Sequence, residues 1–234
     1  MVVTNTPDAV TEGTANIAMG LLLACTRRIV PADAFVRSGR FEKEGNGFPS
    51  GWMGVHLSGQ TMCIVGAGRI GYAVAKRTVA FGMKVSYVAR SSHADFEASP
   101  IGARRVELDE GLRTADVVSL HTPLTPQTRG LIGAKQIALL KPTAVLINTA
   151  RGPIVDEAAL ADALQRKAIW GAGLDVFERE PAVHAALLTL DNVVLTPHIG
   201  SAEAFWRRRM TEMVRDNVLT ALAGHVPPNA VKTH

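Results

Sequence analysis

Residues 64–71 read IVGAGRIG, and this stretch decides how the rest of the chain is interpreted. Its three glycines, Gly66, Gly68 and Gly71, follow an apolar run and precede a helical pattern. Glycines spaced in this way between a strand and a helix allow a phosphate to approach the backbone closely. The alternative is a tight turn that binds no ligand, and the spacing by itself is compatible with both.

The sequence on either side of this loop favours a dinucleotide site. The run TMCIV at 61–65 predicts a strand, and apolar residues recur at helical spacing after the loop. In that context the first glycine permits the turn, the second leaves room for a pyrophosphate, and the third brings the helix close to the strand. The amides of Arg69 and Ile70 would then face the anion at the start of the helix.

Apolar runs alternate with helical patterns along the rest of the chain. Because these runs are continuous rather than alternating, they indicate a parallel sheet covered on both faces. We expect helices at 11–30, at 157–167 after an Asp156 cap, and at 202–222. The sequence therefore predicts an α/β protein with a Rossmann-type doubly wound parallel sheet. The further strands are expected at KVSYVA (84–89), near Val106, and at VVSL (117–120), TAVLIN (143–148), WGAGLDV (170–176) and NVVLT (192–196).

Composition is typical of a globular protein. The chain has 234 residues, 47% of them hydrophobic, which suits one large domain or one domain and part of another. The formal net charge is +4, but the basic residues are scattered. The densest group, at 207–209, has no accompanying aromatic or basic stripe, so we expect a solvated face or a subunit contact and no nucleic acid partner.

The cysteines and the apolar runs bear on the cellular compartment of the protein. Cys25 and Cys63 are far apart in apolar stretches, so they fit neither a disulfide framework nor a metal site, and a reducing compartment is expected. The most apolar run, 17–25, is too short to span a membrane, and no basic segment precedes an apolar one at the N-terminus. We expect a cytoplasmic protein with no membrane partner.

The end of the second strand bears on the choice of cofactor. A site selective for NAD places an acid here to bind the ribose hydroxyls, but the sequence has Ala89 followed by Arg90, Ser91 and Ser92. An arginine with neighbouring hydroxyls suits a 2′-phosphate, so we expect NADP(H) in preference to NAD(H). Alternatively, Arg90 stacks on the adenine or lies in solvent.

Three polar residues follow three further strands. Arg151 lies in INTARGPIVDEAAL, Glu180 in GLDVFEREP, and His198 in NVVLTPHIGS. The carboxyl ends of strands in an open α/β sheet face the ligand crevice, so these side chains are expected to converge. Taken singly, Arg151 could form a surface salt bridge, Glu180 could be solvated, and His198 could cap a helix.

Together, these side chains suit the reduction of a carbonyl group. An imidazolium can donate a proton to the carbonyl oxygen as hydride reaches the carbon. A neighbouring carboxylate stabilises the protonated ring and fixes its tautomer. A guanidinium can bind a carboxylate and polarise the adjacent keto group.

The motifs taken together resemble the D-isomer-specific 2-hydroxyacid dehydrogenase family. The matching stretches are VGAGRIG, HTPLTPQTRGLI, LINTARGPIVDEAAL, GLDVFEREP and LTPHIGSA. The resemblance implies that Arg151 binds the substrate, that His198 donates the proton and that Glu180 is its partner. Further cofactor-binding positions implied by the resemblance are Thr122, Pro123, Thr149, Asp175 (for the nicotinamide carboxamide) and Gly200. The end of the second strand most resembles the NADPH-preferring glyoxylate/hydroxypyruvate reductase branch.

The resemblance also implies a domain organisation. The sequence begins where family members are already past the first lobe of their substrate domain, so only a remnant of that domain is expected. We expect the remnant and a linking helix at 1–30, the dinucleotide-binding domain with a dimerisation arm at 31–200, and a helix returning to the substrate domain at 201–234. Residues 1–3 would be a strand without a sheet, and the final helix would expose an apolar stripe. A homodimer is expected through the arm.

Three functions are compatible with this sequence. The first is NADPH-dependent reduction of glyoxylate or hydroxypyruvate. The second is a dinucleotide-binding module with little turnover, which absence of the lobe would favour. The third is an NAD-dependent relative such as a phosphoglycerate dehydrogenase, against which Ala89 and Arg90 argue.

Overall fold

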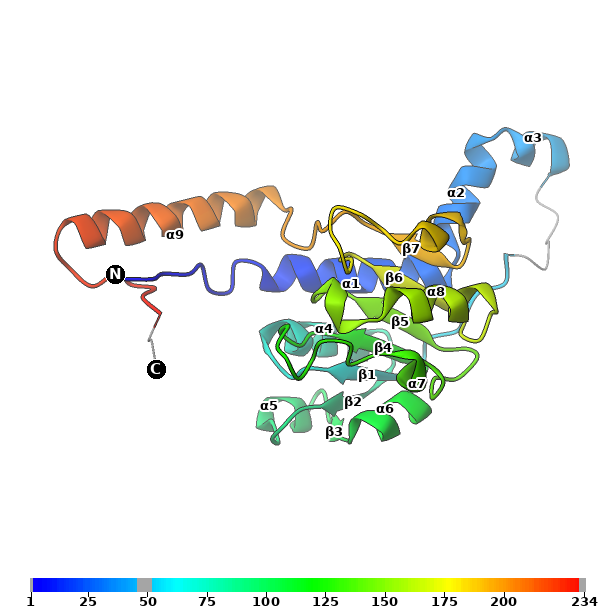
Figure 1. The fold of residues 1–234 in the computed structure, drawn as a ribbon, viewed down its shortest axis with the longest axis horizontal. Helices are drawn as coiled ribbons and strands as arrows, with labels where there is room; N and C mark the ends of the chain where they lie inside the picture. Colours follow the sequence, from blue (N-terminus) through cyan, green and yellow to red (C-terminus); the bar gives the residue numbers. More distant parts are fainter. Residues whose placement is uncertain (1, 46–51, 232–234) are drawn as a thin grey trace.

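Seven parallel strands form the centre of the molecule in a computed structural model that describes residues 2–45 and 52–231 (Figure 1). Their order across the sheet is β3-β2-β1-β4-β5-β6-β7, so the chain runs outward from β1 and then returns to place β4 on its other side. This reversal confirms the predicted doubly wound sheet. The strands are β1 (Thr61–Val65), β2 (Lys84–Val88), β3 (Arg104–Arg105), β4 (Val117–Leu120), β5 (Val145–Asn148), β6 (Gly171–Leu174) and β7 (Val193–Leu195).

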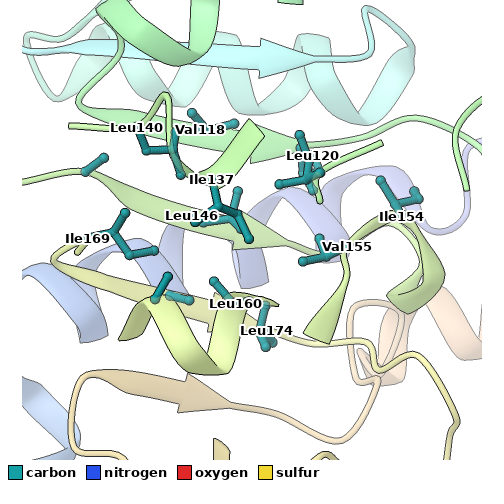
Figure 2. Close-up of a cluster of buried hydrophobic side chains, with 14 of the residues drawn as sticks. Val118, Leu120, Ile137, Leu140, Leu146, Ile154, Val155, Leu160, Ile169 and Leu174 are labelled. Atoms are coloured by element: carbon teal, nitrogen blue, oxygen red, sulfur yellow. The ribbon is translucent and has the colours of Figure 1, made fainter. Parts of the chain in front are cut away.

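Helices cover both faces of this sheet. One hydrophobic core lies under α6, α7 and α8, and Figure 2 shows it with Leu146 and Leu160 at its centre. The other core lies under α1, α4 and α5. The helices are α1 (Thr11–Thr26), α2 (Ile29–Arg37), α3 (Arg40–Glu44), α4 (Arg69–Ala80), α5 (Ala94–Glu97), α6 (Leu108–Thr114), α7 (Ala134–Ile137), α8 (Glu157–Gln165) and α9 (Ala204–Leu222), with short 3-10 turns at Gly152–Ile154 and Ala185–Thr189.

The first predicted helix is divided in two. We expected a helix to residue 30, but α1 ends at Thr26 and Arg28 has a left-handed backbone with φ of 51°. The chain then continues as α2 and α3, which project from the sheet as an arm (Figure 1). In this arm the Phe35 ring lies 5.3 Å from that of Trp52, and residues 46–51 lie outside the described part.

The first and last described segments, 2–5 and 229–231, lie side by side, away from the sheet (Figure 1). Within the described residues, Thr4 forms a single antiparallel bridge with Ala230, and residues 2–3 are not in a strand. The predicted apolar stripe of α9 is largely open, since Val214 is 50% exposed and Leu222 is 80% exposed. The domain divisions at 30 and 200 stay predictions.

Candidate active site

The glycine loop has the backbone geometry that its sequence predicts. The strand β1 ends at Val65 and α4 begins at Arg69. Gly66 has φ of 110°, and a Cβ there would lie 2.7 Å from the carbonyl carbon of His121. A Cβ on Gly71 would lie 2.2 Å from the carbonyl oxygen of Gly66. By contrast, nothing lies within 4 Å of a Cβ placed on Gly68, so the space before the helix is open.

A cavity of about 640 Å³ adjoins this loop at the carboxyl ends of the central strands. The residues that line it come from the N-terminal part of α1, from the start of α4 and from the segments after β4, β5, β6 and β7. Among the predicted site residues, it brings together Ile70, Thr122, Pro123, Thr149, Arg151, Asp175, His198 and Gly200. Of the three side chains expected to converge, Arg151 and His198 line this cavity, whereas Glu180 does not.

Several polar atoms of the cavity wall are buried without a partner in the described residues. These atoms are Thr122 Oγ1, Thr149 Oγ1 and His121 Nδ1. The other nitrogen of His121 lies 2.8 Å from the Ser119 hydroxyl, and burial lowers the pKa of this histidine to about 3, so its ring is neutral. Because buried polar groups normally have partners, this wall fits a ligand rich in hydroxyl and phosphate oxygens, as a dinucleotide is.

Asp175 supports the segment that carries His198. Its carboxylate is buried and accepts hydrogen bonds from the Thr196 hydroxyl at 2.6 Å and from the amides of Ile199 at 2.9 Å and Gly200 at 2.8 Å. The Thr196 side chain before His198 and the backbone after it are thereby attached to one carboxylate. Its role toward the nicotinamide, implied by the resemblance, stays a prediction.

His198 and Glu180 form a close pair at the mouth of the cavity. Glu180 Oε2 lies 2.8 Å from His198 Nδ1, while Oε1 accepts from the Phe177 amide at 3.0 Å. Partial burial raises the pKa of Glu180, but the hydrogen bonds from His198 and Phe177 and the charges of His198 and Arg151 outweigh it, so the pKa is lowered overall. His198 itself has a left-handed backbone with φ of 55°. With Nδ1 engaged by Glu180, Nε2 is the ring nitrogen left for a ligand.

Arg151 completes this end of the cavity. Its carbonyl accepts from the Asn148 side chain at 3.1 Å, and the Asn148 oxygen accepts from the Ala150 amide at 3.1 Å. The guanidinium donates to the Ala150 carbonyl at 2.6 Å, which leaves further N–H groups for an anion. Its charge contributes to the lowered pKa of Glu180, so the two side chains are close enough to interact electrostatically.

The residues predicted to choose the cofactor lie outside the cavity. Arg90 and Ser91 are exposed and follow β2, the neighbour of β1 in the sheet. Arg69 is also exposed, and its guanidinium pairs with Asp8 at 3.0 Å. Its backbone amide lies at the start of α4. None of these three side chains lines the cavity that holds Arg151 and His198.

The comparisons with known proteins agree with this geometry. The family model described as "D-isomer specific 2-hydroxyacid dehydrogenase, NAD binding domain" matches residues 19–200. The chain belongs to this family. It is therefore a nicotinamide-dinucleotide-dependent 2-hydroxyacid dehydrogenase by descent, as the motifs indicate.

Relatives of this dehydrogenase cover nearly the whole chain. A glyoxylate reductase of Thermococcus litoralis is 50% identical over 230 residues, which are 98% of this chain and 69% of the relative. A crystal structure of a Thermus thermophilus protein matches with a TM-score of 0.92 and 45% identity, over 99% of this chain and 72% of that one. An NADPH-dependent glyoxylate/hydroxypyruvate reductase of Sinorhizobium meliloti, in complex with NADP and malonate, matches with a TM-score of 0.90 and 40% identity, over 99% and 70% of the two chains.

Some residues of the dehydrogenase cavity were not found from the sequence. His121 directly precedes Thr122 at the end of β4, so its position after a buried strand was an available signal. Thr14 had no such signal, because it lies on α1 and approaches Gly200 only through the fold. The additional lining residues are Val10, Thr14, His121, Leu124, Ala150 and Ser201. Among the described residues, no group of three or more His, Cys, Asp or Glu side chains could hold a metal ion, and no helix is long and apolar enough to cross a membrane.

Proposed function

We propose that this protein reduces a small 2-oxoacid, glyoxylate or hydroxypyruvate, to the 2-hydroxyacid with NADPH. The observation that carries the proposal is the His198–Glu180 pair beside Arg151 at one end of the cavity. The names of the relatives in Thermococcus litoralis and Sinorhizobium meliloti support the substrate class.

The roles of the residues follow from their contacts. The bound nicotinamide would supply the hydride for the keto carbon. Arg151 binds the substrate carboxylate and polarises the keto group. His198 holds a proton on Nε2 and donates it to the keto oxygen, while Glu180 holds Nδ1 at 2.8 Å and so fixes the ring and stabilises its charged form. The lowered pKa of Glu180 keeps that carboxylate ionised at neutral pH.

The preference for NADPH rests on the end of β2. Ala89 stands where an acid would bind ribose hydroxyls and repel a 2′-phosphate, and Arg90 and Ser91 follow it. A guanidinium and a hydroxyl can both donate hydrogen bonds to phosphate oxygens. Arg90 lies in solvent, where it is free to reach a ligand.

A second function is favoured by the openness of the catalytic end. The His198 side chain is 48% exposed, whereas hydride transfer is helped by the exclusion of water. This exposure favours a dinucleotide-binding module with little turnover as the second candidate.

We also propose a homodimer formed through α2 and α3, in the reducing compartment that the two free, buried cysteines support. The exposed apolar side chains of α2 and α3 are Ile29 at 51%, Val30 at 50%, Val36 at 55% and Phe41 at 45%. Light scattering tests this: the chain should have twice its formula mass, and Phe41→Glu should halve it. Leu188→Glu, at an apolar position 64% exposed elsewhere, is the control and should stay dimeric.

The main experiment measures NADPH consumption with glyoxylate and hydroxypyruvate together with cofactor binding by fluorescence. Turnover with NADPH exceeding that with NADH supports the reductase. Binding without turnover would favour the module, and preference for NADH would favour the NAD-dependent relative.

A further inference from the structure

Arg105 on the edge strand β3 contacts the loop that carries Arg90 and Ser91. Its Nε donates to the Ala89 carbonyl at 2.9 Å, and its Nη2 donates to the Arg90 carbonyl at 3.2 Å. One guanidinium thus holds two successive carbonyl groups directly after β2. Nothing in the sequence pattern pointed to this residue.

This contact fixes the direction of two amides. In a trans peptide the N–H points opposite to the C=O, so an Ala89 carbonyl directed at β3 turns the Arg90 amide away from β3. The side away from β3 is that of β1, since the Val88 carbonyl on that side accepts from Gly66. The Ser91 amide likewise points away from Arg105. Neither amide has an acceptor within the described residues, so both are free to donate to a ligand.

Within the described residues, the Arg105 guanidinium forms no ion pair with a carboxylate. Its neighbour Arg104 pairs with Glu110 at 2.5 Å, whereas Arg105 contacts only the two carbonyls in the described part of the chain. An acid does lie nearby: Glu97 accepts from the hydroxyls of Ser92 and Tyr87, each at 2.5 Å. Arg90 and Arg105 together still give this loop two cations against that one carboxylate.

We propose that Arg105 is a positioning residue for the 2′-phosphate end of the dinucleotide. It directs the amides of Arg90 and Ser91 toward the ribose side and adds a positive charge behind them. This inference rests on the proposed preference for NADPH. It adds a residue that touches the loop backbone and sets how well Arg90 and Ser91 bind a phosphate.

The test measures binding, not turnover. Adenosine 2′,5′-bisphosphate, NADPH and NADH are titrated calorimetrically against the wild type, Arg105→Gln, Arg105→Lys and the matched control Arg104→Gln. We expect Arg105→Gln to weaken binding of the bisphosphate and of NADPH about fivefold to tenfold, and binding of NADH about twofold or less, because a neutral ribose hydroxyl interacts weakly with a charge. Arg105→Lys should recover part of the loss, and added salt should reduce the difference.

Two results would overturn the inference. One is bisphosphate binding by Arg105→Gln within twofold of wild type. The other is an equal loss for NADPH and NADH with a lower melting temperature, which would make Arg105 a purely structural residue. Failure of the proposed cofactor preference is recognised separately, because the wild type would then bind NADH as tightly as NADPH and Arg90→Gln would change neither.

Discussion

The proposed catalytic and adenosine ends of the cofactor site are built in different ways. At the catalytic end, side chains are hydrogen-bonded to one another and to the backbone. Asp175 is buried and accepts three hydrogen bonds, and Glu180 is hydrogen-bonded to His198 and to the Phe177 amide. At the adenosine end, exposed side chains follow a strand, and a single guanidinium holds their backbone. We therefore expect substitutions at the catalytic end to alter kcat, and substitutions at the adenosine end to alter which cofactor binds.

The largest expected effect is at the catalytic end. His198→Asn, which tolerates the left-handed backbone better than most residues, should lower kcat by about 10²–10⁴, the usual contribution of a general acid. Cofactor affinity should be unchanged, because the variant keeps the loop and Asp175. Steady-state kinetics and fluorescence titration check both, with His225→Asn as the control. An unchanged kcat would remove His198 from the mechanism.

The glycine loop between the two ends allows a matched pair. Gly66→Ala should destabilise the fold by about 2–5 kcal/mol, because φ is 110° and a Cβ would lie 2.7 Å from His121. Gly68→Ala should change stability by less than about 1 kcal/mol, since nothing lies within 4 Å of that Cβ, yet weaken cofactor binding about tenfold or more. Urea unfolding and calorimetric titration separate the two effects. Full cofactor affinity in Gly68→Ala would place the pyrophosphate elsewhere.

A smaller effect is expected at the adenosine end. Arg90→Gln should reduce the ratio of NADPH to NADH affinity about tenfold, because it removes a charge-assisted hydrogen bond to phosphate. The value of kcat at saturating cofactor should stay within about twofold of wild type. If kcat falls as much as affinity does, the two ends of the cleft are not separable.

The smallest effect concerns pH. The pKa of Glu180 is lowered, so this carboxylate accepts from His198 at neutral pH and loses that role only as pH falls through the lowered pKa. Any stabilisation from the pair is therefore present above the ordinary carboxyl range and lost on acidification. Glu180→Gln should lack this acid dependence, because an amide does not titrate in this range. Rate–pH profiles of the two proteins check this difference.

Local patterns in the sequence predicted the centre of the fold. The strand, glycine turn and helix around Gly68 are specified by neighbouring residues, so periodicity and steric rules were sufficient. Arg151 and His198 were expected to converge because the carboxyl ends of parallel strands share one edge. This expectation needed only the order of strands along the chain.

Contacts that depend on register or on a distant helix were not predictable. Arg105 reaches the Ala89 carbonyl only because β2 and β3 pair with Tyr87 opposite Arg105. Thr14 approaches Gly200 because α1 packs against β5, β6 and β7. No periodicity in the sequence predicts such a contact. The end of α1 at Thr26 was missed because the left-handed turn at Arg28 uses neither glycine nor proline.

The hydrogen bonds of Asp175 have a consequence for how the enzyme would respond to its cofactor. The Asp175 carboxylate accepts from the two backbone amides directly after His198 and from the Thr196 hydroxyl before it. A ligand that donates a hydrogen bond to the remaining lone pair of this carboxylate would further fix the position of Asp175. We therefore expect cofactor binding and the orientation of His198 to be coupled through this one side chain.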